Sequence, residues 1–251
     1  MPEVNAQNRA EIIGENMSFA ASVAYKLLRT NLMFSLPDEG GCRIIGITSA
    51  IPAEGKSTTT LNLAYVLAQT GKSVLVIEAD MRLPTYSTTL SLQAVPGLSN
   101  VLAGLSKYHE AIQPSGLLDN LFVVVAGDIP PNPSELLGSS RFGDALAAYA
   151  AKVDFIIVDL PPVLSVSDAA TIAPLVQGFL VITRQSYDTK RNLREALRQL
   201  GLANSKILGF VVTRAGGGGG GHKYYKKGYG YGYGYGYGEQ PKSKKDSKSK
   251  K

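Results

Sequence analysis

The sequence has no tryptophan and only one cysteine, Cys42, so it cannot form an intrachain disulfide. It also lacks any apolar run close to the roughly 18 residues that a membrane-spanning helix requires. Residues 1–16 carry neither the basic nor the apolar region of a secretory signal peptide. These absences predict a cytoplasmic protein that reaches a membrane only through a partner or through its C-terminal tail.

Acidic residues are scarce at the C-terminus, which makes the charge distribution uneven. Residues 222–251 hold nine lysines against Glu239 and Asp246, so this tail has a net charge of +7. The rest of the chain has 17 basic and 18 acidic residues and is nearly neutral. A basic tail suits an anionic membrane surface or a nucleic acid, but the neutral body indicates neither. We expect no nucleic-acid partner.

Short apolar runs, by contrast, are plentiful between residues 43 and 213. Six of them are unbroken rather than alternating, which is typical of strands covered on both faces. They are RIIGIT (43–48), VLVIEA (74–79), LFVVVA (121–126), FIIVDL (155–160), FLVITR (179–184) and ILGFVVT (207–213). Segments of helical spacing lie between them, at 57–70, 134–151, 168–176 and 188–200, with Ser134 and Asp188 as expected N-caps. This order predicts a doubly wound α/β domain with a mostly parallel sheet.

The two ends of the chain have different patterns. Residues 19–34 have the spacing of an amphipathic helix, which we expect to cover one side of the sheet. From Gly216 onward, glycine leaves too little apolar side chain to offset the entropy of ordering, so a disordered tail is predicted. The predicted organisation is an N-terminal extension (1–17), a folded domain (18–215) and a disordered tail rich in glycine, tyrosine and lysine (216–251).

A candidate phosphate-binding loop follows the first predicted strand, in SAIPAEGKSTTTLNLA (49–64). In such a loop, backbone N–H groups wrap the phosphates, a lysine reaches the β and γ phosphates, and a hydroxyl ligates Mg²⁺. Lys56 and Ser57 take the last two roles. Ala50 replaces the first glycine of the general pattern, but the order of strand, loop and helix is the required one. The sequence therefore predicts a mononucleotide site formed by Ala53, Glu54, Gly55, Lys56, Ser57 and Thr58.

Carboxylates stand where two predicted strands end. Glu78 and Asp80 are two residues apart, so in an extended backbone they point the same way, and Asp159 ends a later strand. A lone aspartate after a strand is more often a helix cap or a solvated terminus. Because ligands bind at the carboxyl ends of strands in this class of fold, the phosphate loop favours a functional interpretation of Asp80 and Asp159.

These motifs occur together with a C-terminal tyrosine cluster. The chain has GKST, then the acidic pair followed by Arg82 and Pro84, then VDLPPV (158–163), and finally seven of its thirteen tyrosines between residues 222 and 239. Over about residues 18–237 it resembles the bacterial tyrosine kinases, in particular the free-standing cytoplasmic kinase subunit of capsule and exopolysaccharide systems. The resemblance implies a P-loop NTPase fold of the deviant Walker class, related to the partition ATPases.

The resemblance also implies the chemistry and its residues. ATP and Mg²⁺ are the expected cofactors. The implied catalytic residues are Lys56, Glu78, Asp80, Arg82 and Asp159, with Glu78 as the base for the phenol proton. The implied metal ligands are Ser57, Asp80 and Asp159. The implied phosphate acceptors are Tyr224, Tyr225, Tyr229, Tyr231, Tyr233, Tyr235 and Tyr237.

Partners follow from the same resemblance. It implies a transmembrane activator of the polysaccharide co-polymerase kind, which recruits the kinase to the inner face of the membrane. It further implies a ring-shaped homo-oligomer, other protein substrates phosphorylated on tyrosine, and a cognate phosphotyrosine phosphatase. A Gly-Tyr repeat by itself would indicate a low-complexity adhesive segment, but the motifs upstream favour a substrate. The lysine-rich end, 241–251, is not explained by the resemblance.

Two departures from the family pattern leave alternatives open. Glu78 stands where the family usually has aspartate, and Val23, Lys26 and Arg29 stand where it often has E-x-x-R-x-x-R for subunit contacts. A partition or division-site ATPase would carry a second lysine early in the loop, where this chain has Ile51. A catalytically silent scaffold would require that Glu78 has disabled the chemistry. Both remain alternatives to the kinase.

Overall fold

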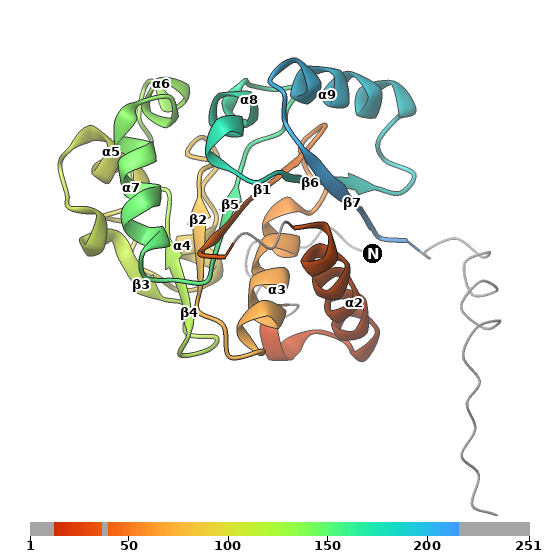
Figure 1. Ribbon diagram of the computed structural model, residues 1–251, viewed down its shortest axis with the longest axis horizontal. Helices are drawn as coiled ribbons and strands as arrows, with labels where there is room; N and C mark the ends of the chain where they lie inside the picture. Colours follow the sequence, from red (N-terminus) through yellow and green to blue (C-terminus); the bar gives the residue numbers. More distant parts are fainter. Residues whose placement is uncertain (1–12, 37–39, 216–251) are drawn as a thin grey trace, which may run out of the picture. The chain divides into compact units, whose positions relative to one another are not determined.

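Seven strands form one sheet in the computed structural model, which describes residues 13–36 and 40–215 (Figure 1). The strand order is β3-β4-β2-β5-β1-β6-β7, and every neighbouring pair is parallel except the antiparallel pair β3 and β4. The strands are β1 (Arg43–Ser49), β2 (Val74–Glu78), β3 (Ile112–Pro114), β4 (Leu121–Val124), β5 (Phe155–Asp159), β6 (Phe179–Arg184) and β7 (Ile207–Thr213). The predicted doubly wound, mostly parallel α/β fold is confirmed.

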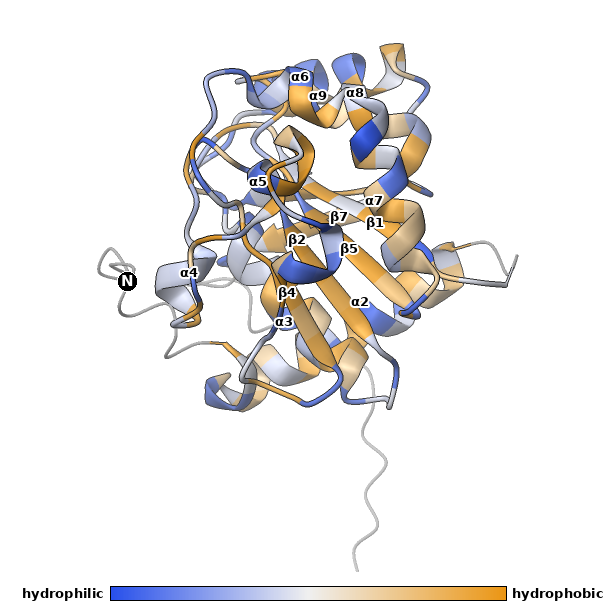
Figure 2. Ribbon diagram, turned by 90° about the vertical axis from the view of Figure 1, so that its left-hand side faces the viewer, coloured by the Kyte–Doolittle hydropathy of each residue, from blue (hydrophilic) through white to orange (hydrophobic). Residues whose placement is uncertain are grey.

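The apolar runs form strands because both faces of the sheet are covered. Along β2, Val74 and Val76 pack into the core on one face, while Leu75 and Ile77 pack into the core on the other. Successive side chains of a strand point to opposite faces, so a strand buried on both sides needs apolar residues at every position. Figure 2 shows these strands as the hydrophobic centre of the molecule.

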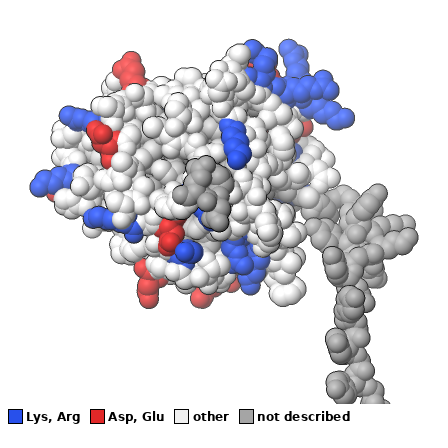
Figure 3. Space-filling view, viewed as in Figure 1, with Lys and Arg blue, Asp and Glu red and all other residues white. Residues whose placement is uncertain are grey.

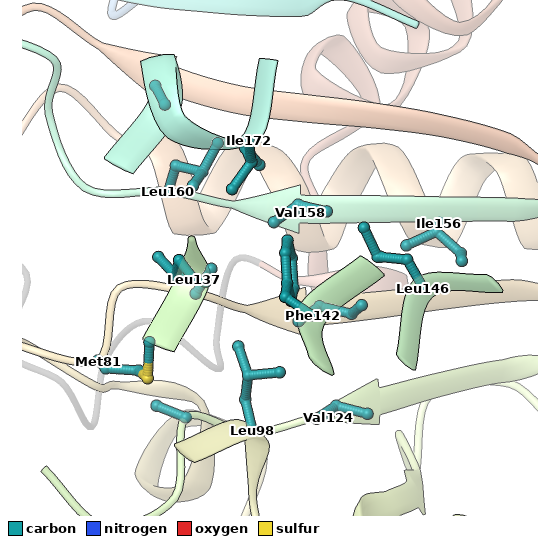
Figure 4. Close-up of a cluster of buried hydrophobic side chains, with 14 of the residues drawn as sticks. Met81, Leu98, Val124, Leu137, Phe142, Leu146, Ile156, Val158, Leu160 and Ile172 are labelled. Atoms are coloured by element: carbon teal, nitrogen blue, oxygen red, sulfur yellow. The ribbon is translucent and has the colours of Figure 1, made fainter. Parts of the chain in front are cut away.

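One face of the sheet is covered by the helices that follow β2, β4, β5 and β6. Figure 4 shows Phe142 and Leu146 packing against Val158 and Ile156 of β5 in this layer. The helices that contribute to this core are α5 (Leu98–Ala103), α6 (Pro133–Leu137), α7 (Ser140–Ala150), α8 (Asp168–Ile172) and α9 (Lys190–Leu202). Short 3-10 helices, η3 (Tyr108–Ala111) and η4 (Ala173–Leu175), follow α5 and α8.

The other face is covered mainly by α3 (Lys56–Ala68), of whose 13 residues 11 are buried. Helix α2 (Phe19–Ser35), preceded by η2 (Gly14–Asn16), lies against α3 and the edge strand β7 (Figure 1). Its Arg29 donates from Nη1 to the carbonyl of Val66 in α3 at 2.7 Å. Helix α2 therefore covers the sheet at its edge strand, as expected, while α3 covers the central strands on the same face.

The predicted helix starts were partly wrong. Segment 134–151 forms two helices, α6 and α7, and the N-cap of α6 is Asn132 rather than Ser134, whose hydroxyl binds Asp168 instead. At α9 the cap is Thr189 rather than Asp188, because the Thr189 side chain accepts the backbone N–H of Asn192. Helix α4 (Tyr86–Thr89), α5 and strand β3 were not predicted, since none has a long apolar pattern.

Two surface properties concern the possible partners. None of the helices in the described residues is long and apolar enough to cross a membrane. Lysine and arginine side chains gather over α9 (Figure 3), where Lys190, Arg191, Arg194 and Arg198 are exposed. The predicted tail, with its seven acceptor tyrosines, lies outside the described residues.

Candidate active site

The phosphate-binding loop connects β1 to α3 at the carboxyl edge of the sheet. Gly55 is the N-cap of α3 and has a φ of 93°, a left-handed conformation that glycine adopts without strain. Ala53 shares this left-handed region with a φ of 62°. Lys56, the first residue of α3, is 9% exposed, and Ser57 and Thr58 follow in the first turn. The backbone N–H groups at this helix start and the Lys56 ammonium are the groups that a phosphate site of the predicted kind would use.

Glu54 stabilises this loop through its own side chain. It is 1% exposed, and its carboxylate accepts the backbone N–H groups of Ile51 and Arg184, each at 3.0 Å. Its carbonyl accepts the Thr213 hydroxyl at 2.8 Å. Burial raises the pKa of this carboxyl, and the two amides oppose the rise. Glu54 therefore ties the loop to the ends of β6 and β7, so that any contact it makes with a nucleotide comes from its backbone.

Asp159 is the last residue of β5 and is 1% exposed. Its Oδ2 accepts the hydroxyl of Tyr86 at 2.8 Å, whereas its Oδ1 is buried with no hydrogen-bond partner among the described residues. Burial raises the pKa of the Asp159 carboxyl, while the Lys56 ammonium and the Ser57 hydroxyl act in the opposite direction. A buried carboxylate oxygen without a donor is costly unless a cation completes its surroundings.

Asp80 lies beside the same groups. Burial raises the pKa of its carboxyl, and the charge of Lys56 is the strongest of the influences that lower it. The backbone N–H groups of Leu83, at 3.3 Å from Oδ1, and of Arg82 hold the carboxylate in place. Asp80 also acts on Asp159, whose pKa it raises by like-charge repulsion. The structure thus brings Lys56, Ser57, Asp80 and Asp159 together, although they come from three separate segments of the sequence.

Glu78 lies at the end of β2 and is 2% exposed. Its Oε1 accepts the backbone N–H of Thr85 and, at 2.9 Å, that of Tyr86, while Oε2 accepts that of Ala126 at 3.1 Å. Burial raises the pKa of Glu78 to about 7 despite these three amides, and the nearby Asp159 contributes to the rise. In this arrangement Glu78 anchors the segments that follow β2 and β4.

Arg82 is held by two side chains from the neighbouring helices. Its Nη1 lies 2.6 Å from Oδ2 of Asp168, a fully buried carboxylate at the start of α8. Its Nη2 donates to the Ser134 hydroxyl at 2.8 Å, and that hydroxyl donates to Oδ1 of Asp168 at 2.6 Å. The guanidinium is therefore engaged with α6 and α8 rather than with Lys56 or Asp159.

The oxygen atoms near Lys56 fit a magnesium ion. Mg²⁺ prefers oxygen ligands and is usually bound by one or two carboxylates together with substrate phosphates. Asp80, Asp159 and the Ser57 hydroxyl provide that donor set, and the unpartnered Oδ1 of Asp159 is the atom that most needs a cation. No group of three or more acidic, histidine or cysteine side chains that could hold a metal ion occurs within residues 13–36 and 40–215. The donor set therefore suits a metal ion that arrives with a nucleotide.

Sequence reasoning missed three residues of this region: Tyr86, Ser134 and Asp168. Tyr86 is fully buried, and burial followed by the charges of Asp159 and Glu78 raises the pKa of its hydroxyl far above the ordinary value. Ser134 and Asp168 carried only weak sequence signals, since both occur near predicted helix starts. Their contacts with Arg82 join segments 52 and 86 residues apart, which no local pattern reveals.

Comparison with known proteins identifies the family. A family model described as an AAA domain matches residues 42–190. The chain is 39% identical to the tyrosine-protein kinase YwqD of Bacillus subtilis over 191 residues, which cover 76% of this chain and 80% of that protein.

Solved structures agree with this match. The kinase domain of the Escherichia coli tyrosine kinase ETK superposes with a TM-score of 0.76 at 32% identity, covering 89% of this chain and 84% of that one. The septum site-determining protein MinD of Pyrococcus horikoshii, solved with Mg-ADP, gives a lower TM-score of 0.59 at 26% identity, covering 70% and 71%. The fold is thus shared with a division-site ATPase, but the chain is a member of the bacterial tyrosine kinase family.

Proposed function

We propose that the chain transfers the γ-phosphoryl group of ATP to tyrosine hydroxyls, with Mg²⁺ bound beside the phosphates. The observation that carries this proposal is the grouping of Lys56, Asp80 and Asp159 around the start of α3, with one buried oxygen of Asp159 left without a donor. The relatives named tyrosine-protein kinases give the acceptor class.

The transfer forms a bond between the γ phosphorus and the phenol oxygen and breaks the bond to the oxygen that bridges the β and γ phosphates. Lys56 and the N–H groups of the loop stabilise the charge that develops on the phosphates. Ser57, Asp80 and Asp159 would hold Mg²⁺, which neutralises phosphate charge when it is bound. The phenol proton leaves to a carboxylate within hydrogen-bond reach.

Glu78 is the proposed base, and its surroundings make that role testable. With a pKa of about 7 it is partly ionised at neutral pH, which suits proton transfer. Its oxygens accept three backbone amides, two at Oε1 and one at Oε2, so the free lone pair of Oε2 is the place for the phenol proton. Asp80, half-buried and held only by neighbouring amides, is the second candidate for the base.

The acceptors we propose are the seven tail tyrosines, together with tyrosines of other proteins. We further propose that the kinase acts in capsule or exopolysaccharide synthesis and that a membrane-spanning partner recruits and activates it. It would assemble into a homo-oligomeric ring, and a phosphotyrosine phosphatase would remove the phosphates that it adds. No nucleic-acid partner is part of this proposal.

Phosphotyrosine detection on the purified full chain with Mg·ATP tests the activity. The wild type should accumulate phosphotyrosine, more so with its activator, and a variant with all seven tail tyrosines changed to phenylalanine should lose most of it. ATP hydrolysis without any phosphotyrosine, with or without the activator, would contradict the proposal and favour a division-site type of ATPase.

A further inference from the structure

We propose that Asp168 and Ser134 are positioning residues for phosphoryl transfer, which fix Asp80 by clamping Arg82. The proposal rests on the kinase function proposed above and assigns a role to two residues outside the nucleotide site. It also makes Arg82 a positioning residue rather than a group that contacts the phosphates.

In this clamp, Arg82, Asp168 and Ser134 are all hydrogen-bonded to one another at short distances. Asp168 uses one oxygen for Arg82 at 2.6 Å and the other for Ser134 at 2.6 Å, and Ser134 in turn accepts from Arg82 at 2.8 Å. Asp168 is fully buried, whereas the Arg82 side chain is 31% exposed. A planar guanidinium can satisfy two acceptors at once, so this geometry fixes the orientation of Arg82 and not merely its charge.

The clamp reaches the site through the backbone. Asp80 and Arg82 are two residues apart, and the N–H of Arg82 is one of the two amides that hold the Asp80 carboxylate. If the guanidinium loses its anchor, the segment carrying Asp80 loses one of the contacts that hold it beside Lys56 and Asp159.

The anchor is itself rigid because α6 and α8 pack closely. Ser134 lies in the first turn of α6 and Asp168 begins α8. At the far end of α6, a Cβ on Gly138 would lie only 3.2 Å from the methyl group of Thr171 in α8. The clamp thus transmits the position of two packed helices to one carboxylate of the nucleotide site.

The test is the change Asp168→Asn in the full chain, which keeps the shape of the side chain and removes its charge. We expect the rate constant for tyrosine phosphorylation to fall about 10-fold to 100-fold, the size usual for outer residues that orient a site. The affinity for ADP in EDTA should stay unchanged, since Lys56 and its loop are intact. The gain in ADP affinity that Mg²⁺ produces should be largely lost.

The matched control is Asp154→Asn, which makes the same chemical change just before β5, at the end of that strand opposite to Asp159. Asp154 also pairs with a cation, Lys72, at 3.1 Å. This variant should lose stability but keep both the transfer rate and the Mg²⁺ effect on ADP affinity. The double variant Arg82→Gln with Asp168→Asn should transfer no more slowly than the slower single variant, because residues that act as one unit are not additive.

Three outcomes would overturn the proposal. In Asp168→Asn, Mg²⁺ could still raise ADP affinity as much as in the wild type, or ADP affinity could fall as much in EDTA as it does with Mg²⁺. In the double variant, the two losses of transfer rate could be additive. If Asp168→Asn does not fold, Ser134→Ala tests the proposal instead, because it keeps the ion pair between Arg82 and Asp168. It should lose a smaller part of the gain in ADP affinity that Mg²⁺ produces. If it loses none of that gain, the clamp is overturned. If the wild type phosphorylates no tyrosine while Asp168→Asn still shows the predicted changes in ADP affinity, the kinase proposal is refuted and the clamp is not.

Discussion

The two ends of strand β5 carry aspartates with opposite properties. At the amino end, Asp154 accepts the backbone N–H and the hydroxyl of Ser73, both at 2.8 Å, and hydrogen bonds lower its pKa. At the carboxyl end, Asp159 is buried, has one oxygen without a partner, and has a raised pKa. A carboxylate that meets its donors within the fold stabilises the fold. A buried carboxylate with an oxygen that lacks a donor costs stability, and its place beside the phosphate loop indicates a functional role.

The largest expected effect comes from removing the Lys56 ammonium, the positive charge beside the carboxyl end of β5. Lys56→Met should reduce tyrosine phosphorylation about 100-fold to 1000-fold, because a positioned charge on the phosphates is lost. Lys56 also lowers the pKa of Asp80 and of Asp159, so both carboxyls should hold their protons to higher pH in the variant. Phosphotyrosine detection measures the first effect, and denaturant unfolding serves as the control for an intact fold. Transfer at the wild-type rate would refute the role of Lys56.

The comparison is sharpest when both aspartates are changed to asparagine. Asp159→Asn should transfer phosphate at least about 100-fold more slowly yet be no less stable than the wild type, since an unpartnered buried charge is removed. Asp154→Asn should keep its activity and lose about 1 kcal/mol of unfolding free energy through its weakened bonds to Ser73. Urea unfolding and initial rates measure the two quantities. If the two variants lost stability equally, the proposed difference between the ends would be wrong.

The pH dependence of stability should show the same contrast. The pKa of Glu78 is about 7 in the fold and 4.5 as the ordinary value, so the folded state holds this proton longer than the unfolded state does. Its stabilising contribution is complete below pH 4.5 and is lost as the pH rises through 7, a change of up to about 3 kcal/mol.

Glu78→Gln should therefore match the wild-type stability at low pH and exceed it at neutral pH, as measured by urea unfolding across that range. Asp154 provides a control of opposite sign, because its lowered pKa gives stability that is lost as the pH falls. A wild-type curve parallel to that of Glu78→Gln would contradict the raised pKa. Transfer by Glu78→Gln at the full rate would remove Glu78 as the base and leave Asp80.

The last expected effect concerns stability alone and comes from Tyr86. Tyr86→Phe removes the hydroxyl that donates to Oδ2 of Asp159, whose Oδ1 already lacks a hydrogen-bond partner among the described residues. The variant should lose about 1–2 kcal/mol of stability at neutral pH. In an Asp159→Asn background the loss should shrink, since the hydroxyl no longer faces a charge. An equal loss in both backgrounds would show that the ring environment of Tyr86 matters and its hydrogen bond does not.

The sequence predicted the strands well because each is covered on both faces and had to be continuously apolar. It predicted Lys56, Asp80 and Asp159 for a related reason, since the carboxyl ends of parallel strands meet at one edge. It failed for β3, a three-residue strand containing Pro114, and for the caps at Ser134 and Asp188. Ser134 takes its partners from distant segments, since its hydroxyl binds Arg82 and Asp168, whereas Asp188 accepts the neighbouring Thr189 amide and the Asn192 side chain instead of capping α9.

The burial of α3 has a consequence for motion. With 11 of its 13 residues buried and Arg29 of α2 bonded to its Val66 carbonyl, α3 should exchange its hydrogen-bonded amide protons with solvent only when the whole domain unfolds. The backbone that carries Lys56 should therefore keep its position during turnover. Adjustment to nucleotide falls to the segment after β4, where Ile129 is 66% exposed and whose amides should exchange early.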